Sequence, residues 1–276
     1  MTDTRTTGPI PRAIWVGFVA AAFYIVLAAV GGNLFGAFAG DDETLEFVLS
    51  HYVPVPVLIA VGLVLLWRAG WTQEAFTSPS PFTERGRWWM LAIPVVLAAQ
   101  TISLLVGVPW SQTTVAVVVS FLIGTLLIGF GEELYFRGIF RVTVLGHHRE
   151  LAALLITSFA FGFSHTVGYL FEGMGIVTIL GQTLFLAVDG ALFYGALRAT
   201  GTLWVPILLH GVGDFARYLQ AGGDDGTRSA MSGNDMFAAV TIWITFILAI
   251  ALVVSIARQD HRARRAAAAA DSADVS

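Results

Sequence analysis

The chain has 276 residues, of which 56% are hydrophobic and 12% are charged, and its formal net charge is −4. This composition excludes a soluble globular domain, and the length allows about eight membrane-spanning helices of about 20 residues each. Cysteine is absent, which excludes disulfides, thiolate metal ligands and a cysteine nucleophile. The predicted fold class is therefore all-α, a polytopic membrane protein built as a bundle of about eight transmembrane helices.

Eight apolar stretches follow one another along the chain, and the first is too long for the hydrophobic region of a signal peptide. We expect an N-terminal cytoplasmic tail at 1–12, one transmembrane domain at 13–258 with its motifs in 113–215, and a tail at 259–276 that is disordered or a frayed helix. The predicted spans are 13–38, 52–68, 89–109, 113–136, 151–166, 175–197, 202–219 and 236–257.

Arginine side chains crowd every second connection between these spans. The connection after the first span is acidic, with Asp41 and Asp42, whereas Arg137, Arg141 and Arg149 follow the fourth span. The positive-inside rule then places both termini in the cytoplasm. We expect a multi-pass protein of the cell membrane.

Three polar clusters interrupt the apolar spans. An ionisable group at membrane depth costs about 2.5–3.5 kcal/mol on insertion scales unless it is paired or hydrated, and such groups usually mark function. Because the clusters lie on three separate spans, together they predict one hydrated reaction site within the bilayer. In chain order they are Glu132 with Glu133 and Arg137, then His165, then His210 with Asp214.

Helical spacing relates the residues within each cluster. Glu133 and Arg137 are four residues apart, so they can form a salt bridge that leaves Glu132 free to face the site. His210 and Asp214 also share a helix face, and a carboxylate one turn away can orient an imidazole. Taken singly, these clusters are also typical of a capped helix end or of a buried polar pair that locks two helices together.

Two further residues accompany the clusters. Phe161 lies one turn before His165 on the same face, and Asp189 is an additional intramembrane acid.

The predicted boundaries conflict with a single site, because they put Glu132 near the end of its span and His165 about 20 Å from the start of the next one. Either the fifth helix enters the bilayer later than Leu151 or the fourth is broken near its glycines at 129 and 131.

The three patterns E-E-x-x-x-R, F-x-x-x-H and H-x-x-x-D, in this order, resemble those of the CPBP intramembrane proteases. That family unites CAAX prenyl endopeptidases of the Ras-converting type with bacterial proteins linked to bacteriocin processing and self-immunity. The resemblance extends from Thr113 to Phe215. It implies an eight-helix membrane peptidase whose site lies within the bilayer and opens toward the cytoplasm and the lipid.

The resemblance also implies roles for individual residues. Glu132 and His165 would activate the attacking water, and His210 and Asp214 would bind the oxyanion. The family commonly has asparagine where this chain has Asp214, and an ionised aspartate would repel an oxyanion. We count Glu133 with these four catalytic residues, and Arg137, Phe161 and Asp189 as structural support.

The sequence does not decide whether a metal is used or which substrate is cleaved. Glu132, His165 and His210 are also a legitimate zinc ligand set, so a divalent metal is an alternative to a metal-free mechanism, although no HExxH motif is present. The expected partners are the lipid bilayer and a membrane-associated or prenylated-type peptide or protein, entering from the membrane or the cytoplasm, and not nucleic acid. Alternatives are a non-catalytic immunity or scaffold protein and, less favoured, an ion or proton transporter.

Overall fold

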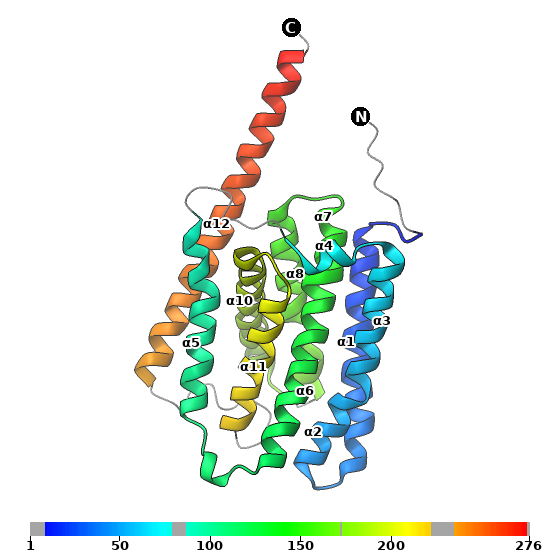
Figure 1. Cartoon of the computed structure of the whole chain (residues 1–276), viewed down its shortest axis with the longest axis vertical. Helices are drawn as coiled ribbons and strands as arrows, with labels where there is room; N and C mark the ends of the chain where they lie inside the picture. Colours follow the sequence, from blue (N-terminus) through cyan, green and yellow to red (C-terminus); the bar gives the residue numbers. More distant parts are fainter. Residues whose placement is uncertain (1–8, 79–86, 172, 222–234, 275–276) are drawn as a thin grey trace.

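The computed structural model describes residues 9–78, 87–171, 173–221 and 235–274, and in these ranges the chain is a bundle of helices without a named strand (Figure 1). The all-α, polytopic fold class is confirmed. The elements are α1 (Ile14–Gly36), η1 (Ala37–Ala39), α2 (Glu43–Tyr52), α3 (Pro54–Ala69), α4 (Thr72–Phe76), η3 (Trp88–Leu91), α5 (Ala92–Val106), η4 (Trp110–Gln112), α6 (Val115–Glu133), η5 (Leu134–Phe140), α7 (Arg141–Leu145), α8 (Glu150–Ser164), α9 (Thr166–Phe171), α10 (Ile176–Thr200), α11 (Trp204–Gln220) and α12 (Asp235–Asp274).

Seven stretches of helix in the described part of the chain are long and apolar enough to cross a membrane. They correspond to every predicted span except the seventh, which is α11, a helix of 17 residues. At about 1.5 Å per residue α11 is about 25 Å long. It packs against α5, α6 and α10 inside the bundle.

Two predicted boundaries differ from the observed ones because of local chemistry. The second span begins at Glu43 rather than at 52, since Asp42 caps α2 by accepting a hydrogen bond from the Leu45 amide at 3.0 Å. The helix then bends where Pro54 opens α3. At the other end of the chain, α12 continues to Asp274, through the segment where we expected a disordered tail or a frayed helix, because alanine has the highest helix propensity.

The fourth span is the one whose boundary matters for function. We expected it to end at 136, but α6 continues without a break through the π-helical segment η5 into α7 and ends at Leu145. All seven residues of η5 are buried. Arg137 and Arg141, which we expected in the following loop, are buried as well, because Arg141 donates to the carbonyls of Arg137 and Glu74 at 2.6 and 2.5 Å.

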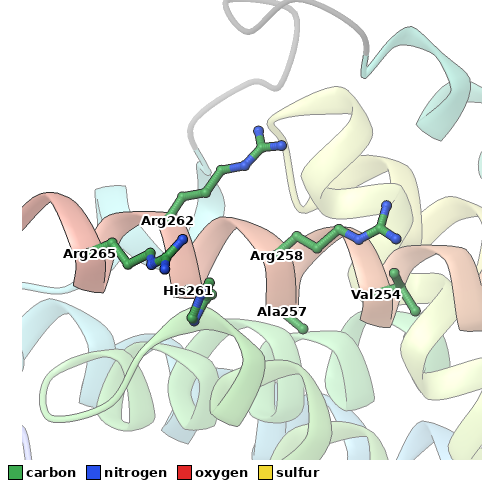
Figure 2. Close-up of a pocket in the computed structure, with 6 residues that line it drawn as sticks. All are labelled: Val254, Ala257, Arg258, His261, Arg262 and Arg265. Atoms are coloured by element: carbon green, nitrogen blue, oxygen red, sulfur yellow. The ribbon is translucent and has the colours of Figure 1, made fainter.

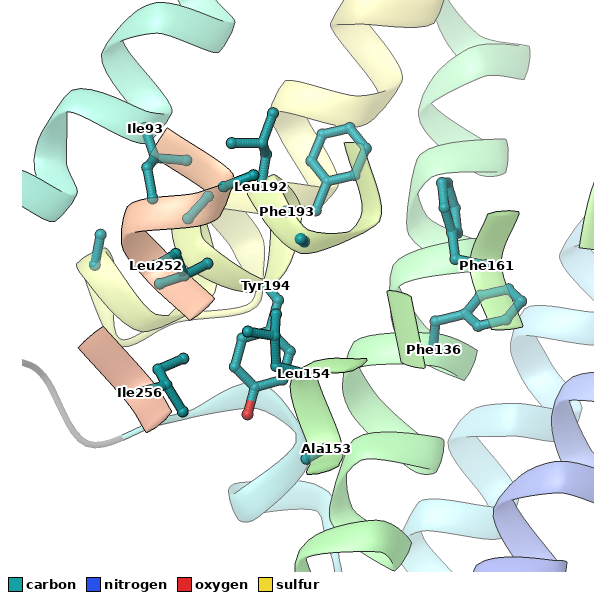
Figure 3. Close-up of a cluster of buried hydrophobic side chains, with 14 of the residues drawn as sticks. Ile93, Phe136, Ala153, Leu154, Phe161, Leu192, Phe193, Tyr194, Leu252 and Ile256 are labelled. Carbon is teal, nitrogen blue, oxygen red and sulfur yellow. The ribbon is translucent and has the colours of Figure 1, made fainter. Parts of the chain in front are cut away.

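Helix packing at the centre of the bundle depends on glycine. A Cβ added to Gly129 of α6 would lie 2.6 Å from the backbone nitrogen of Gly211 of α11, so the two helices meet backbone to backbone. Small residues allow such close approach in membranes, where no hydrophobic force joins helices. On the other side of the site, buried apolar side chains of η5, α8, α10 and α12 form the largest core cluster (Figure 3).

Many large apolar side chains point away from this core. Trp15, Phe18, Val57, Ile102 and Trp243 are each more than 60% exposed. An outward surface of this kind is what a bilayer would cover. The protein is therefore a multi-pass membrane protein.

Candidate active site

The depth conflict in the sequence is resolved by the longer fourth span. Glu132 precedes Leu145, the end of α7, by 13 residues, and His165 follows Glu150, the start of α8, by 15 residues. At about 1.5 Å per residue, both side chains lie about 20 Å from the connection that joins the two helices. α6 is not broken near Gly129, so that alternative was wrong, and the point at which α8 enters the bilayer stays a prediction.

Glu132 occupies the centre of the candidate site. Its Oε2 atom lies 3.9 Å from Nε2 of His165 and 3.8 Å from Nε2 of His210. These side chains come from α6, from the end of α8 and from α11, as the three sequence clusters predict. The Oε2 atom is buried and has no hydrogen-bond partner among the described residues. A buried carboxylate oxygen without a partner is costly, and such atoms often mark catalytic groups or bound water.

His165 ends α8, where its ring is held by the preceding turn. Its Nδ1 lies 3.0 Å from the Phe161 carbonyl oxygen and 3.1 Å from the Ser164 hydroxyl. A carbonyl only accepts, so a proton on Nδ1 satisfies this contact and leaves Nε2, the nitrogen nearest to Glu132, as a proton acceptor. The side chain of His165 is 29% exposed, so this edge of the site is accessible.

His210 is held on both of its ring nitrogens by carboxylates. Nδ1 lies 3.0 Å from Oε1 of Glu133, and Nε2 lies 3.2 Å from Oδ2 of Asp214. The ring also stacks flat on Phe193, with centroids 4.7 Å apart and an interplanar angle of 11°. These contacts fix the orientation of the imidazole and direct Nε2 toward Glu132.

Glu133 and Arg137 form a buried salt bridge next to the site. Arg137 donates from NH1 to Oε1 of Glu133 at 3.0 Å, as the four-residue spacing predicts, and from NH2 to the Gly190 carbonyl at 2.9 Å. Both side chains are 0% exposed. The guanidinium also lies 4.2 Å from the ring centroid of Phe161. Arg137 therefore supports the site structurally and does not border its accessible side.

Phe161 links the two histidines. Its ring centroid is 5.1 Å from that of His165 and 5.6 Å from that of His210, in both cases edge to face. Asp189 of α10 lies within electrostatic range of His210 and Asp214. Arg137 and Phe161 thus contact predicted catalytic residues.

Two residues of the site were missed by the sequence reasoning. Arg217 donates from NH1 to Oδ1 of Asp214 at 2.9 Å. The three-residue spacing of this pair on α11 is a signal for such contact. Phe193 had no signal, because an aromatic residue in an apolar helix is ordinarily core.

The metal hypothesis fits this geometry poorly. His210 faces a carboxylate oxygen with each ring nitrogen, so neither nitrogen is free to ligate a cation. In the described part of the chain, no group of three or more His, Asp or Glu side chains is arranged to hold a metal ion. We therefore derive no step through a metal.

The fold and the site define a class of protein. It is an all-helical membrane protein in which a glutamate and two histidines lie close together inside the bundle. A family model described as type II CAAX prenyl endopeptidase Rce1-like matches residues 113–216, which contain all of these side chains. This match confirms the resemblance to the CPBP and CAAX protease family. Neither the comparison with curated proteins nor that with solved structures gave a match.

Proposed function

We propose that this protein is a CAAX-type intramembrane endopeptidase in which Glu132 and His165 activate water to cleave a peptide bond. The observation that carries the proposal is the position of the unpartnered Oε2 atom of Glu132 between two imidazole nitrogens. The family match supports peptidase activity of this general kind. A water molecule can bridge atoms 3.8–3.9 Å apart, a separation too long for a direct hydrogen bond.

In the proposed first step, Glu132 is the general base. The water held between Glu132 and His165 loses a proton to the carboxylate as its oxygen attacks the scissile carbonyl carbon. General-base catalysis of this type contributes about 10²–10⁴-fold to the rate. His165 accepts a hydrogen bond from the water at Nε2, which orients the attacking lone pair.

The second step concerns the oxyanion and the leaving group. His210, protonated on both nitrogens, would donate to its two carboxylate neighbours, and its Nε2 proton can turn to the oxygen of the tetrahedral intermediate. One such donor is worth about 3–4 kcal/mol. The proton that Glu132 received then passes to the departing amine as the C–N bond breaks, which returns the carboxylate to its starting state.

The aspartate that replaces the family's common asparagine is compatible with this scheme. Oδ1 of Asp214 is occupied by Arg217, so the negative charge beside the oxyanion position has a neutralising partner. Asp214 then positions His210 rather than binding the oxyanion itself. We infer that the Asp214–Arg217 pair fulfils the role that a neutral amide has in the relatives.

For the substrate we propose a membrane-associated or prenylated-type peptide. The scissile bond must reach a site about 20 Å along the helices from the connection between α7 and α8, and a lipid chain on the substrate would partition into the bilayer beside the site. We place the protein in the cell membrane with the site open to the cytoplasm, because the arginine-rich connections follow the positive-inside rule.

The decisive experiment compares Glu132→Gln with the wild type. The amide cannot accept the proton, so we expect cleavage of membrane peptides, measured in nanodiscs and by peptidomics of cells, to fall by at least about 10²-fold. Glu46→Gln, an exposed change on α2, is the matched control and should cleave normally.

Protein level and metal content are measured alongside. An unchanged peptide profile in Glu132→Gln at normal protein level would contradict the peptidase and favour the immunity or scaffold role. Proton or ion flux into proteoliposomes that depends on Glu132 would favour the transporter instead.

A further inference from the structure

Along one exposed face of α12, the side chains change from apolar to cationic toward the C-terminus. We define the apolar stripe as Trp243, Ile247, Ile250 and Val254, spaced by four, three and four residues, and all exposed. Such spacing keeps side chains on one face of a helix. The same line continues into a cationic stripe that we define as Arg258, His261, Arg262 and Arg265.

A surface hollow of about 430 Å³ lies where the two stripes meet. It is lined by Val254 and Ala257 at one end and by the cationic stripe at the other. Figure 2 shows these side chains on α12, with Arg258 and Arg262 extended away from the helix. The hollow thus has one apolar and one positively charged end.

The opposite face of α12 is already occupied. Leu252 and Ile256 are fully buried in the core, and Asp260 accepts a hydrogen bond from the Leu151 amide at 3.0 Å. Gln259 accepts from Arg87 and Arg198 at 2.7 and 2.6 Å. These contacts fix the rotation of the helix, so that the two stripes face outward.

The arginines of the cationic stripe are not paired with acidic side chains of the described part of the protein. Within the ranges that the structure describes, Arg258, Arg262 and Arg265 have no ion-pair partner and are exposed. Arg258 lies about 6 Å beyond Val254 along the axis, and Arg262 a further 6 Å. The polar headgroup layer is about 5–8 Å deep on each side of the hydrocarbon core, so with Val254 at the edge of that core the backbone of Arg258 falls in the layer, and the long side chain of Arg262 can reach back to it from about 4 Å beyond.

We propose that this face of α12 is a binding site for an anionic phospholipid. The acyl chains lie along the apolar stripe, and the phosphate is held by Arg258 and Arg262, since guanidinium groups bind phosphate oxygens in bidentate fashion. Arg265 and His261 add positive charge around the headgroup. A lipid with net negative charge is preferred over a zwitterionic one, whose own cation would meet the arginines. This site is separate from the peptidase site and does not depend on the proposed function.

The test measures which lipids stay with the protein. Wild-type protein is equilibrated with equal amounts of phosphatidylglycerol and phosphatidylcholine in detergent, and the retained lipids are quantified by mass spectrometry. We expect enrichment of phosphatidylglycerol, and a drop of about tenfold in that enrichment for the triple variant Arg258→Gln, Arg262→Gln, Arg265→Gln. All three positions are exposed, so the melting temperature should not change.

A charge-matched control separates a site from bulk attraction. The triple variant Arg68→Gln, Arg149→Gln, Arg264→Gln removes the same charge from exposed positions outside the stripe and should keep the enrichment. Equal enrichment in all three proteins, or equal loss in both variants, would overturn the proposal. So would displacement of the lipid by inorganic phosphate in the buffer, which would show that the arginines hold free phosphate rather than a phospholipid.

Discussion

At the scale of single residues, the carboxylates next to Glu132 in the candidate site have charged partners, whereas Glu132 has no hydrogen bond to the described residues on its buried Oε2 atom. Glu133 is held by Arg137 and His210, and Asp214 by His210 and Arg217. Oε2 of Glu132 has no hydrogen-bond partner among the described residues. Because the neighbouring carboxylates are neutralised by these contacts, one unpaired carboxylate can be kept inside the bundle at a tolerable cost in free energy.

The pair of Asp214 and Arg217 allows a sharp test by a double-mutant cycle. We expect Arg217→Gln to lower kcat about 10–100-fold with little change in KM, because Asp214 then carries an uncompensated charge beside the oxyanion. Adding Asp214→Asn to that variant should restore most of the lost kcat. Steady-state cleavage kinetics of the two single variants and the double variant give the coupling.

The cycle distinguishes charge balance from packing. If Arg217 serves only to hold α11 in place, the second change cannot restore kcat and the two losses add. The Asp214→Asn single variant should stay active, as the asparagine of the relatives implies. An inactive Asp214→Asn variant would show that the carboxylate itself is required.

At the scale of elements, the close contact of α6 and α11 sets the distance between Glu132 and His210. A side chain at Gly129 would collide with the backbone of Gly211, which cannot move aside as a flexible side chain could. The two helices would have to separate, and His210 would move with α11. The geometry of the site therefore depends on a residue with no chemistry of its own.

Gly129→Leu should accordingly abolish cleavage and destabilise the protein by about 1–3 kcal/mol, as overpacking does in cores. Unfolding in increasing sodium dodecyl sulfate, followed by circular dichroism, measures the loss of stability. Gly181→Leu on α10 is the matched control, because nothing lies within 4 Å of its added Cβ, and it should behave as wild type. Normal activity of Gly129→Leu would refute the close contact.

At the scale of the whole molecule, the start of α1 and the end of α12 lie at the same end of the bundle (Figure 1). This arrangement requires an even number of crossings, and we obtain one by adding α11 to the seven long apolar helices. Charged contacts gather at that end, where Arg12 pairs with Glu74 and Arg198 with Glu150. We expect this end to face the cytoplasm.

The absence of cysteine makes the orientation easy to measure. Single cysteines at Arg149 and Ala269 should react with a membrane-impermeant maleimide only after cells are permeabilised, whereas a cysteine at Asp41 should react in intact cells. All three positions are exposed, so labelling reports on access and not on burial. The reverse pattern would contradict the cytoplasmic placement of the termini.

The sequence alone determined the membrane class and the approximate position of the spans, and it predicted the residues of the candidate site. Long apolar runs can be read without knowing the fold, because lipid demands them. Ionisable residues inside those runs stand out for the same physical reason. Glu132, Glu133, His165, His210 and Asp214 were recognised in this way, and the structure brings all five together.

Only the tertiary structure decided how these residues meet. The true end of the fourth span depends on Arg137 and Arg141 finding partners on α10 and α4, contacts between segments far apart in sequence. The occupation of both His210 nitrogens and the neutralisation of Asp214 by Arg217 likewise require neighbours in space. A charged side chain can be buried or can end a helix, and which of the two occurs depends on whether the folded bundle supplies its hydrogen bonds.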